Sequence, residues 1–404
     1  MIIERQDTLP DYKWVEKPTK PMRIFCPIHF FPGFEGYEAG GAERFLQLEI
    51  TFLTKNYASD YRMTVYVLNR QKDYSGEIFP EGVNFIGKTS KRDFLGFLLR
   101  EQKNYDLLQI SDGINWPSKR LIGELILWRK PIIGRIAGES NLNIIEKMPQ
   151  ILRKNLFDKI TTVIAISPEI EYGLRKLGIP AEKIAYIANG TDTDLFKPAD
   201  DNTKTELRKR FFGRKISDGK KIFIYHGRIM DRLKRVGELL KIFIESGLGK
   251  AGHALVLIGP NTEDDPQIRS KIEEYINSGE QNNIFWFGSK IGNEIAEYLQ
   301  AADFFVLPSE KEGMSNSLLE AMSSGLFPIV RDGVSGTAVV ENGTSGYKFK
   351  GDEDLGRVMV ELANSSGDFS QITRNARELI VRDYSLELMV RRYDQLYRKV
   401  LGRS

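Results

Sequence analysis

The sequence contains few residues that form disulfides or bind soft metals. Its 404 residues include three histidines and a single cysteine, Cys26. One cysteine cannot form a disulfide within the chain, and this suits a reducing compartment. The histidine and cysteine spacings that are typical of zinc sites do not occur either. The composition therefore argues against a disulfide-rich secreted fold and against a structural zinc domain.

Long apolar runs and a strong excess of one charge are also missing. No stretch approaches the roughly 20 apolar residues that a membrane-spanning helix needs, and residues 1–21 have charges throughout instead of the apolar core of a secretory signal. The chain has 58 basic and 55 acidic residues, a net charge of +3. This charge is too small for a general nucleic-acid binder. We therefore expect a globular cytoplasmic protein that does not bind nucleic acid.

The chain is about twice as long as one hydrophobic core usually organises, which predicts two domains. Short apolar runs alternate with helical patterns on both sides of residue 198, as in parallel sheets covered by helices. Around residue 198 the sequence changes to Asn-Gly, Pro and Asp punctuation, which is typical of a domain boundary. We therefore predict an α/β protein with two doubly wound, Rossmann-like domains. The expected strands are 22–28, 64–69, 106–111, 131–137, 163–167, 221–228, 254–259, 283–288, 302–309 and 327–332.

The strongest local signal is the segment 308–325, which joins the end of a strand to a short helix. Ligands of parallel α/β sheets bind beyond the carboxyl ends of the strands. Gly313 allows the backbone to approach a ligand, and the start of the helix offers free N–H groups to an anion. Glu312 and Glu320 are far enough apart to receive different hydroxyls of one elongated ligand, although each is also an ordinary residue for a helix terminus or surface. The amides expected at this phosphate site are those of Met314, Ser315 and Asn316.

Two further segments place cations or glycines after a predicted strand. Arg228 and Lys234 follow the strand at 221–228 and can converge on one diphosphate, although surface cations would look the same in isolation. Gly40 and Gly41 precede a helical pattern, so they either admit a phosphate or a sugar or simply permit a tight turn. Neither segment alone decides the function.

Taken together, the segments resemble the retaining GT-B glycosyltransferases of glycosyltransferase family 4, the glycosyl transferases group 1. The resemblance runs from Met22 to the last helix, and 306–347 is its most specific part. The matching segments are Gly40-Gly41-Ala42-Glu43-Arg44, IANGTDTDLFKP at 187–198, Gly227-Arg228 with Lys234, and Glu312-x7-Glu320.

The resemblance implies two Rossmann-like domains that face a cleft. It also implies that an amphipathic helix near 386–400 crosses back to the first domain. The implied parts are an N-terminal extension (1–21), an acceptor-side domain (22–198 plus about 385–404) and a donor-binding domain (199–384).

The same resemblance implies the roles of the site residues. Arg228 and Lys234 would hold the diphosphate of a nucleotide-sugar donor, and Glu312 would contact the transferred sugar; these three are the expected catalytic residues. Glu320 would bind the ribose hydroxyls. Cations and helix dipoles then neutralise the leaving diphosphate, so neither a divalent metal nor another cofactor is expected. The remaining expected donor contacts are Gly40, Gly41, Gly313, Met314, Ser315, Asn316 and, around the base, Ser289, Lys290 and Ile291.

The acceptor side departs from the family pattern. Members often carry a histidine in the first domain, and Ser111 occupies that position here, with Asp112 next to it. Either one of these side chains touches the sugar, or the position is only a strand end. A second histidine position is also unmet, and the segment 131–140 offers Arg135 and Glu139 instead. These four residues are the acceptor-side candidates.

We therefore predict a retaining, metal-independent hexosyltransferase that forms an alpha-linked product on a glycan, a lipid-linked or a small-molecule hydroxyl acceptor. A catalytically degenerate GT-B protein that binds a nucleotide sugar or acts as a partner subunit is the alternative.

Two other classes of enzyme are recognised by motifs of their own. Metal-dependent enzymes use D-x-D motifs, which Asp192-Thr193-Asp194 and Asp352-Glu353-Asp354 match by pattern. An NAD-dependent oxidoreductase is disfavoured because the G-x-G-x-x-G fingerprint is missing.

The segment 90–103 mixes cations with phenylalanines and leucines. Such a helix either covers a sheet or lies on a membrane surface, and the second interpretation would place the protein peripherally at the inner face of the membrane. The sequence does not indicate an oligomeric state.

Overall fold

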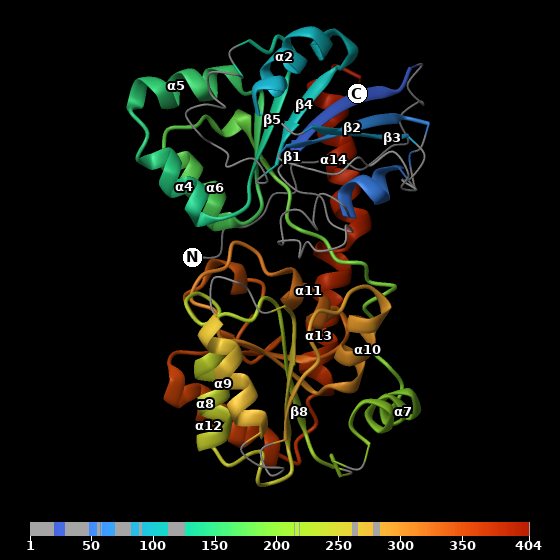
Figure 1. Cartoon of the computed structure of the whole chain (residues 1–404), viewed down its shortest axis with the longest axis vertical. Helices are drawn as coiled ribbons and strands as arrows, with labels where there is room; N and C mark the ends of the chain where they lie inside the picture. Colours follow the sequence, from blue (N-terminus) through green and yellow to red (C-terminus); the bar gives the residue numbers. More distant parts are fainter. Residues whose placement is uncertain are drawn as a thin grey trace.

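The computed structural model describes residues 20–28, 48–54, 57, 59–68, 82–88, 91–111, 125, 127–213, 215–217, 219–260, 266–277 and 283–403. They form two domains, one above the other in Figure 1, each built on one sheet. Every strand pair among these residues is parallel. The predicted pair of Rossmann-like domains is therefore confirmed.

The core of the first domain is a seven-stranded sheet. Its strands are β1 (Met22–Ile28), β2 (Tyr61–Leu68), β3 (Val83–Lys88), β4 (Leu107–Ile110), β5 (Ile132–Ile136), β6 (Thr162–Ala165) and β7 (Ile184–Tyr186). They lie side by side in the order β3-β2-β1-β4-β5-β6-β7. Every residue of β4, β5 and β6 is buried, as expected for short apolar strands covered on both faces.

Helices cover both faces of this sheet. One face packs against α2 (Lys91–Glu101), α4 (Glu139–Glu146), α5 (Gln150–Lys159) and α6 (Pro168–Lys176). The other face packs against the helical residues 48–54 and against the last helix, α14 (Leu386–Val400). Phe97 and Leu98 of α2 are buried in the first of these layers, so this helix covers the sheet.

The second domain is built on a six-stranded sheet. Its strands are β8 (Ile222–His226), β9 (Ala254–Ile258), β10 (Ile284–Trp286), β11 (Phe304–Leu307), β12 (Phe327–Arg331) and β13 (Tyr347–Phe349). Their order is β10-β9-β8-β11-β12-β13. Strands 8 and 11 are therefore neighbours at the centre, and the loops that follow them emerge at the same edge of the sheet.

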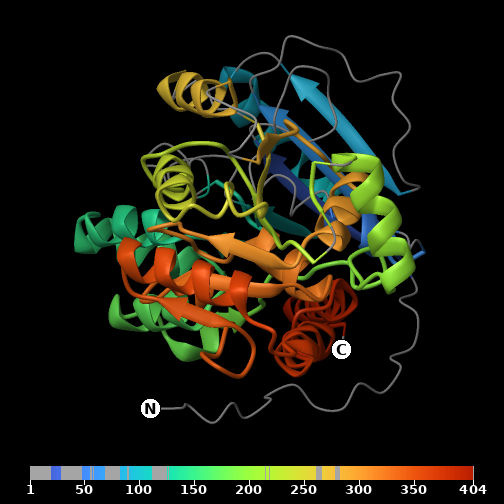
Figure 2. The ribbon, with the colours of Figure 1, turned by 90° about the horizontal axis from the view of Figure 1, so that it is seen from below.

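The helices of the second domain lie on both sides of its sheet, as Figure 2 shows from below. One side holds α7 (Asp201–Phe212), α10 (Asn293–Ala301), α11 (Asn316–Ser323) and α13 (Ser370–Asp383). The other side holds α8 (Val236–Glu245), α9 (Pro266–Asn277) and α12 (Asp352–Asn364). Within the described part of the chain, no helix combines the length and the apolar character that crossing a bilayer requires.

The chain passes between the domains twice, and the two passages lie side by side. The N–H of Thr191 donates to the carbonyl oxygen of Tyr384 at 2.9 Å, and the N–H of Leu386 donates to the carbonyl oxygen of Thr191 at 2.8 Å. A Cβ on Gly190 would lie 2.8 Å from the Cα of Leu386. From this point α14 runs up into the first domain, as predicted (Figure 1).

A buried polar cluster ties α14 to the first sheet. Glu49 is fully buried and accepts hydrogen bonds from Nε2 of Gln109 at 3.0 Å and from the hydroxyl of Tyr397 at 2.6 Å. Burial raises the pKa of Glu49 from 4.5 to about 7, and the two hydrogen bonds oppose this rise only in part. The folded chain therefore holds the proton of this carboxyl more tightly than the unfolded chain does.

The raised pKa of Glu49 predicts a pH-dependent stability. The folded state binds more protons than the unfolded state between pH 4.5 and about 7, so stability is greatest below this window and is lost as the pH rises through it. The loss from this group is on the order of 3 kcal/mol. Chemical denaturation between about pH 5 and 8 should show this fall, and Glu49→Gln should flatten it.

Glu146→Gln is the matched control, because Glu146 is an exposed carboxyl at the end of α4. This variant should keep the pH dependence of the wild type. If Glu49→Gln keeps it as well, Glu49 is not the group responsible.

Candidate functional site

The loops after β8, β9 and β10 each have, at or near their start, a glycine in a conformation that other residues rarely adopt. Gly227, Gly259 and Gly288 have φ values of +153°, +144° and +66°, a backbone region that favours glycine. A Cβ on Gly259 would lie 1.8 Å from the carbonyl oxygen of Gly227. The backbones after β8 and β9 therefore lie in direct contact, and this fixes the start of the segment that bears Arg228.

Lys234 and Glu312 meet beyond the carboxyl ends of β8 and β11. Nζ of Lys234 forms an ion pair with Oε1 of Glu312, and the two side chains are only 16% and 11% exposed. The hydroxyl of buried Tyr225 donates to the carbonyl oxygen of Arg228 at 2.9 Å. Burial raises the pKa of Tyr225, the charge of Glu312 raises it further, and Arg228 opposes this. The predicted residues Arg228, Lys234 and Glu312 are therefore close neighbours.

Arg235 anchors the loop that presents Lys234. It has φ +53°, a conformation that costs a non-glycine residue roughly 1 kcal/mol or more. Its guanidinium donates to Glu310 at 2.9 Å and to Asp352 at 2.6 Å. Asp352 also accepts from Arg331 at 3.0 Å. These ion pairs join the starts of α8 and α12 to the loop before α11, so they hold Lys234 and Glu312 in place.

The helix expected after Gly313 is α11, and its start is capped. Ser315 caps the helix, its Oγ accepting from the N–H of Leu318 at 3.3 Å. Before the cap, the N–H of Gly336 donates to the carbonyl oxygen of Glu312 at 3.0 Å. A Cβ on Gly313 would lie 2.0 Å from the carbonyl oxygen of Ala137. The loop between Glu312 and the helix thus touches the first domain directly.

Glu320 lies on α11 at the sheet, next to the end of β8. Its Oε2 is 3.3 Å from Nδ1 of His226, and the side chains of His226 and Glu320 are 10% and 4% exposed. Sequence reasoning identified Glu320 but not His226. The sequence signal that could have identified His226 is a histidine at the end of an otherwise largely apolar strand.

Two of the acceptor-side candidates connect the first domain to the second. Arg135, buried at the end of β5, donates from Nη2 to Oδ1 of Asn189 at 2.8 Å, and Nδ2 of Asn189 donates to Oδ1 of Asn316 at 2.8 Å. Oε1 of Glu139, the first residue of α4, accepts from Oγ of Ser335 at 2.9 Å. The structure therefore brings both candidates to the edge of the second domain.

Ser111 follows β4 and is almost completely buried. Its Oγ has no hydrogen-bond partner among the residues that the structure describes. Three other candidates, Gly40, Gly41 and Asp112, lie outside the described residues. Asn189, which links the two domains, was not identified from the sequence although it lies in the matching segment 187–198.

The segment expected to contact the base follows Gly288. Ser289 and Ile291 are exposed, and Nζ of Lys290 pairs with Glu294 at 3.2 Å. Ser289 and Ile291 therefore remain accessible to solvent.

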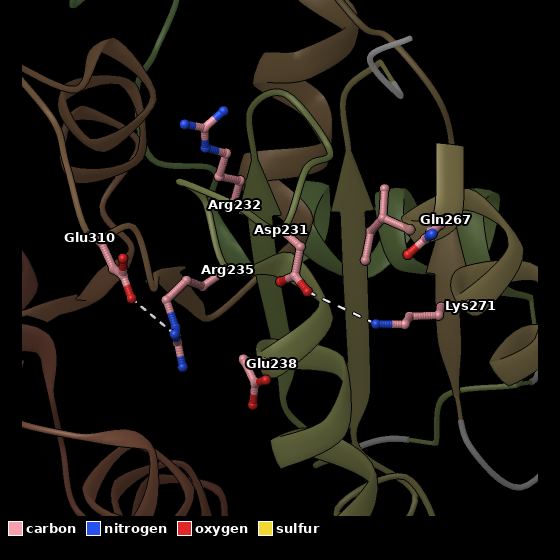
Figure 3. A pocket seen from close by; sticks show the side chains of 8 residues that line it. Asp231, Arg232, Arg235, Glu238, Gln267, Lys271 and Glu310 are labelled. Atoms are coloured by element: carbon pink, nitrogen blue, oxygen red, sulfur yellow. Dashed lines mark hydrogen bonds and ion pairs between the residues drawn. The ribbon is translucent and has the colours of Figure 1, made fainter. Parts of the chain in front are cut away.

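A pocket of about 390 Å³ lies beside the loop 228–235, and none of the predicted site residues lines it. Figure 3 shows its mixed charges, with Arg235 turned to Glu310 and Lys271 4.0 Å from Asp231. Oδ1 of Asp231 also accepts from the N–H of Gly237 at 3.2 Å. Arg235 and Asp231 therefore support the loop 228–235 from this pocket.

The two D-x-D segments have other partners. Asp352 accepts from Arg235 and Arg331, and Asp354 accepts from Arg357 at 2.6 Å and from the N–H of Lys350 at 2.9 Å. Oδ1 of Asp192 accepts from the N–H groups of Asp194 and Leu195 at 3.1 and 3.0 Å. In the part of the chain that the structure describes, no group of three or more His, Cys, Asp or Glu residues is arranged to hold a metal ion.

Comparison with known proteins finds a family match in the second domain. Residues 220–365 match the family model of the glycosyl transferases group 1. The chain is 24% identical over 311 residues to N-acetyl-alpha-D-glucosaminyl L-malate synthase of Bacillus anthracis, covering 74% of this chain and 76% of that protein. It is 27% identical over 233 residues to UDP-Gal:alpha-D-GlcNAc-diphosphoundecaprenol alpha-1,3-galactosyltransferase of Escherichia coli, covering 56% and 57%. The second alignment spans less than two thirds of that relative.

A similar fold occurs among solved structures. The structure of Anabaena HepE in complex with UDP and glucose superimposes with a TM-score of 0.72 at 15% identity, covering 94% of this chain and 100% of that chain. Similarity at this level of identity shows a shared fold. Residues 220–365 therefore form a glycosyl transferases group 1 domain by their family match, and the two-domain fold of the chain is the GT-B fold.

Proposed function

We propose that this chain is a retaining hexosyltransferase that moves a sugar from a nucleoside-diphosphate donor to a hydroxyl acceptor. The observation that carries the proposal is the ion pair of Lys234 and Glu312, which lies beside Arg228 and directly before the start of α11. A cation, a carboxylate and the N–H groups at the start of α11 then lie close together, beyond the carboxyl ends of β8 and β11. This is the set that a sugar diphosphate requires, because its phosphates need positive charge and its sugar hydroxyls need an acceptor.

In the proposed reaction, Arg228, Lys234 and the start of α11 stabilise the negative charge that develops on the leaving diphosphate. The bond between the anomeric carbon and the diphosphate oxygen breaks, and the acceptor oxygen bonds to the same face of that carbon. The proton of the acceptor hydroxyl passes to a phosphate oxygen, so no protein base is needed. Glu312 holds the sugar hydroxyls, and this keeps the anomeric carbon oriented toward the acceptor.

The proposal includes independence from divalent metal ions. Its support is that Lys234 and Arg228 supply positive charge where a metal would supply it, while Asp352 and Asp354 are bound by arginines. Turnover should therefore persist in excess EDTA. Loss of turnover in EDTA, with recovery on addition of Mg²⁺ or Mn²⁺, would overturn this part of the proposal.

The experiment that tests the proposal is a donor screen followed by product analysis. Nucleotide sugars with different bases are added to the protein, and the donor is recognised by a rise in melting temperature, since a ligand that binds the folded state stabilises it. The product formed from that donor is then examined by NMR. Retention of the anomeric configuration supports the mechanism, and inversion contradicts it. Binding without transfer to any acceptor would favour the catalytically degenerate alternative.

A surface of the first domain supports a lipid-linked acceptor. Leu99 and Leu127 are 48% and 42% exposed. The segments that bear them are adjacent, because the N–H of Arg129 donates to Oε1 of Gln102 at 3.1 Å. Exposed apolar side chains among cations suit an anionic membrane surface, and the relative from Escherichia coli is named for a diphosphoundecaprenol acceptor. The exposed cations of this surface are Arg100, Lys103, Arg129 and Lys130.

Vesicle binding tests this surface. The protein should sediment with vesicles that contain about one third anionic lipid, and Arg129→Glu/Lys130→Glu should reduce the bound fraction several-fold, since each basic residue contributes about 1 kcal/mol at such a surface. The matched control is Lys241→Glu/Lys250→Glu, which reverses two exposed charges in the second domain. Equal loss in both variants would mean nonspecific attraction, and no binding by the wild type would favour a water-soluble acceptor.

A further inference from the structure

His226 occupies a position where the strand pattern calls for an apolar residue. Alternate residues of a strand point to opposite faces of the sheet. Along β8, Ile222 and Ile224 pack in the layer that contains α11, whereas Phe223 and Tyr225 pack in the opposite layer. By this alternation the side chain of His226 lies on the α11 side. Its place at the carboxyl end of the strand brings it to the edge where the donor site is formed.

Glu320 faces His226 from α11. The residues around it on this helix, among them Leu319 and Ala321, are buried and apolar. A carboxylate that is 4% exposed in such surroundings is costly unless it has a polar partner. Nδ1 of His226 lies 3.3 Å from Oε2 of Glu320. The two atoms lie at an ion-pair distance without hydrogen-bond geometry. With its hydrogen on Nδ1, the imidazole therefore orients the carboxylate by electrostatic attraction.

We infer that His226 is a positioning residue for the recognition of the donor ribose. It holds the carboxylate of Glu320 at the orientation in which that group accepts hydrogen bonds from the ribose hydroxyls of a nucleoside diphosphate. The inference rests on the proposed function, in which Glu320 binds the ribose, and adds a residue to it. Because His226 acts on the nucleoside half of the donor, it contributes to affinity and not to the stabilisation of the leaving group.

The chain offers an internal control in His253. This histidine is also buried, but it precedes β9 at the opposite edge of the sheet, where its Nδ1 accepts from the N–H of Lys221 at 3.0 Å. Replacing His253 removes a buried imidazole of similar environment without altering the carboxyl edge. A general loss of packing would therefore appear in variants of both histidines, whereas a loss of ribose recognition would appear only in variants of His226.

The test is calorimetric titration of the whole chain with UDP, ADP and GDP. The diphosphate that binds wild type most tightly is then compared with its 2′,3′-dideoxy analogue, which has no ribose hydroxyls. For His226→Leu we expect the dissociation constant of the ribonucleotide to rise about ten-fold, the effect of losing one buried polar contact to a charged group. The dissociation constant of the dideoxy analogue should change by less than about two-fold.

A conservative variant separates the polar contact from shape. His226→Asn retains an N–H donor near the position of Nδ1 and should restore most of the affinity for the ribonucleotide. His253→Asn should leave both dissociation constants unchanged. In turnover, His226→Leu should raise the KM for the donor while kcat changes little, the signature of lost uniform binding.

The outcomes distinguish this inference from the proposed function. If wild type binds none of the three diphosphates, the proposed function fails and the inference fails with it. If wild type binds one but His226→Leu binds it equally well, or loses affinity equally for the dideoxy analogue, the inference alone is overturned. A His226→Asn variant as weak as His226→Leu would also overturn it.

Discussion

Replacement of Lys234 by alanine is expected to lower kcat/KM by about 10²- to 10³-fold, the range seen when one group that stabilises developing charge is removed. Lys234 is 16% exposed, so water cannot fully replace its charge. Removal of the Lys234 side chain has two effects at the site. The leaving diphosphate loses a cation, and Glu312 loses the partner that orients it.

Two variants control this result. Lys234→Arg keeps the charge but not the compact ammonium group, so it should recover part of the activity. Lys241→Ala removes an exposed lysine of α8, outside the site, and should leave kcat/KM unchanged. Steady-state kinetics with the donor identified in the screen provides the measurement, and melting curves confirm that each variant is folded. Unaltered turnover by Lys234→Ala would refute the assignment of the site.

The strands of both sheets were largely predictable, because parallel strands buried on both faces read as short apolar runs. All ten expected strands overlap an observed one. The strands that were not predicted are β3, β7 and β13. Each lies at the outer end of its sheet, where β7 and most of β13 are only partly buried. An edge strand needs less apolar surface, so its sequence resembles that of the surrounding loops.

Candidate residues for the site could be identified from the sequence where one side chain and one motif coincide. Arg228, Lys234 and Glu312 were identified in this way, and the structure brings them together. His226 and Asn189 were missed because their significance depends on a partner distant in the sequence. His226 meets Glu320 only because β8 and β11 are adjacent, and Asn189 meets Asn316 only across the two domains. Single-sequence patterns do not specify such pairings.

The last helix is held to the first domain by a buried ion-pair network. Arg398 of α14 donates to Asp394 at 2.9 Å and to Asp60 at 2.7 Å, and the side chains of Arg398 and Asp394 are 6% and 0% exposed. The hydroxyl of Tyr61 donates to Asp394 at 2.6 Å. Burial raises the pKa of Tyr61 and the charge of Asp394 raises it further. Arg398 and Tyr61 thus share the carboxylate of Asp394, which water hardly reaches.

Asp394→Asn should therefore destabilise the protein by about 3 kcal/mol or more, because it removes the carboxylate and leaves the guanidinium of Arg398 buried with less compensation. The substitution conserves volume, so the loss measures charge and not packing. Chemical denaturation monitored by fluorescence provides the measurement. Glu387→Gln is the control on the same helix, since Glu387 pairs with Arg391 at 2.9 Å on the exposed side. Exposed pairs contribute less than about 1 kcal/mol, so equal destabilisation by both variants would contradict the role assigned to the buried network. A larger loss in Asp394→Asn would show that the chain secures its second passage between the domains with charge as well as with apolar packing.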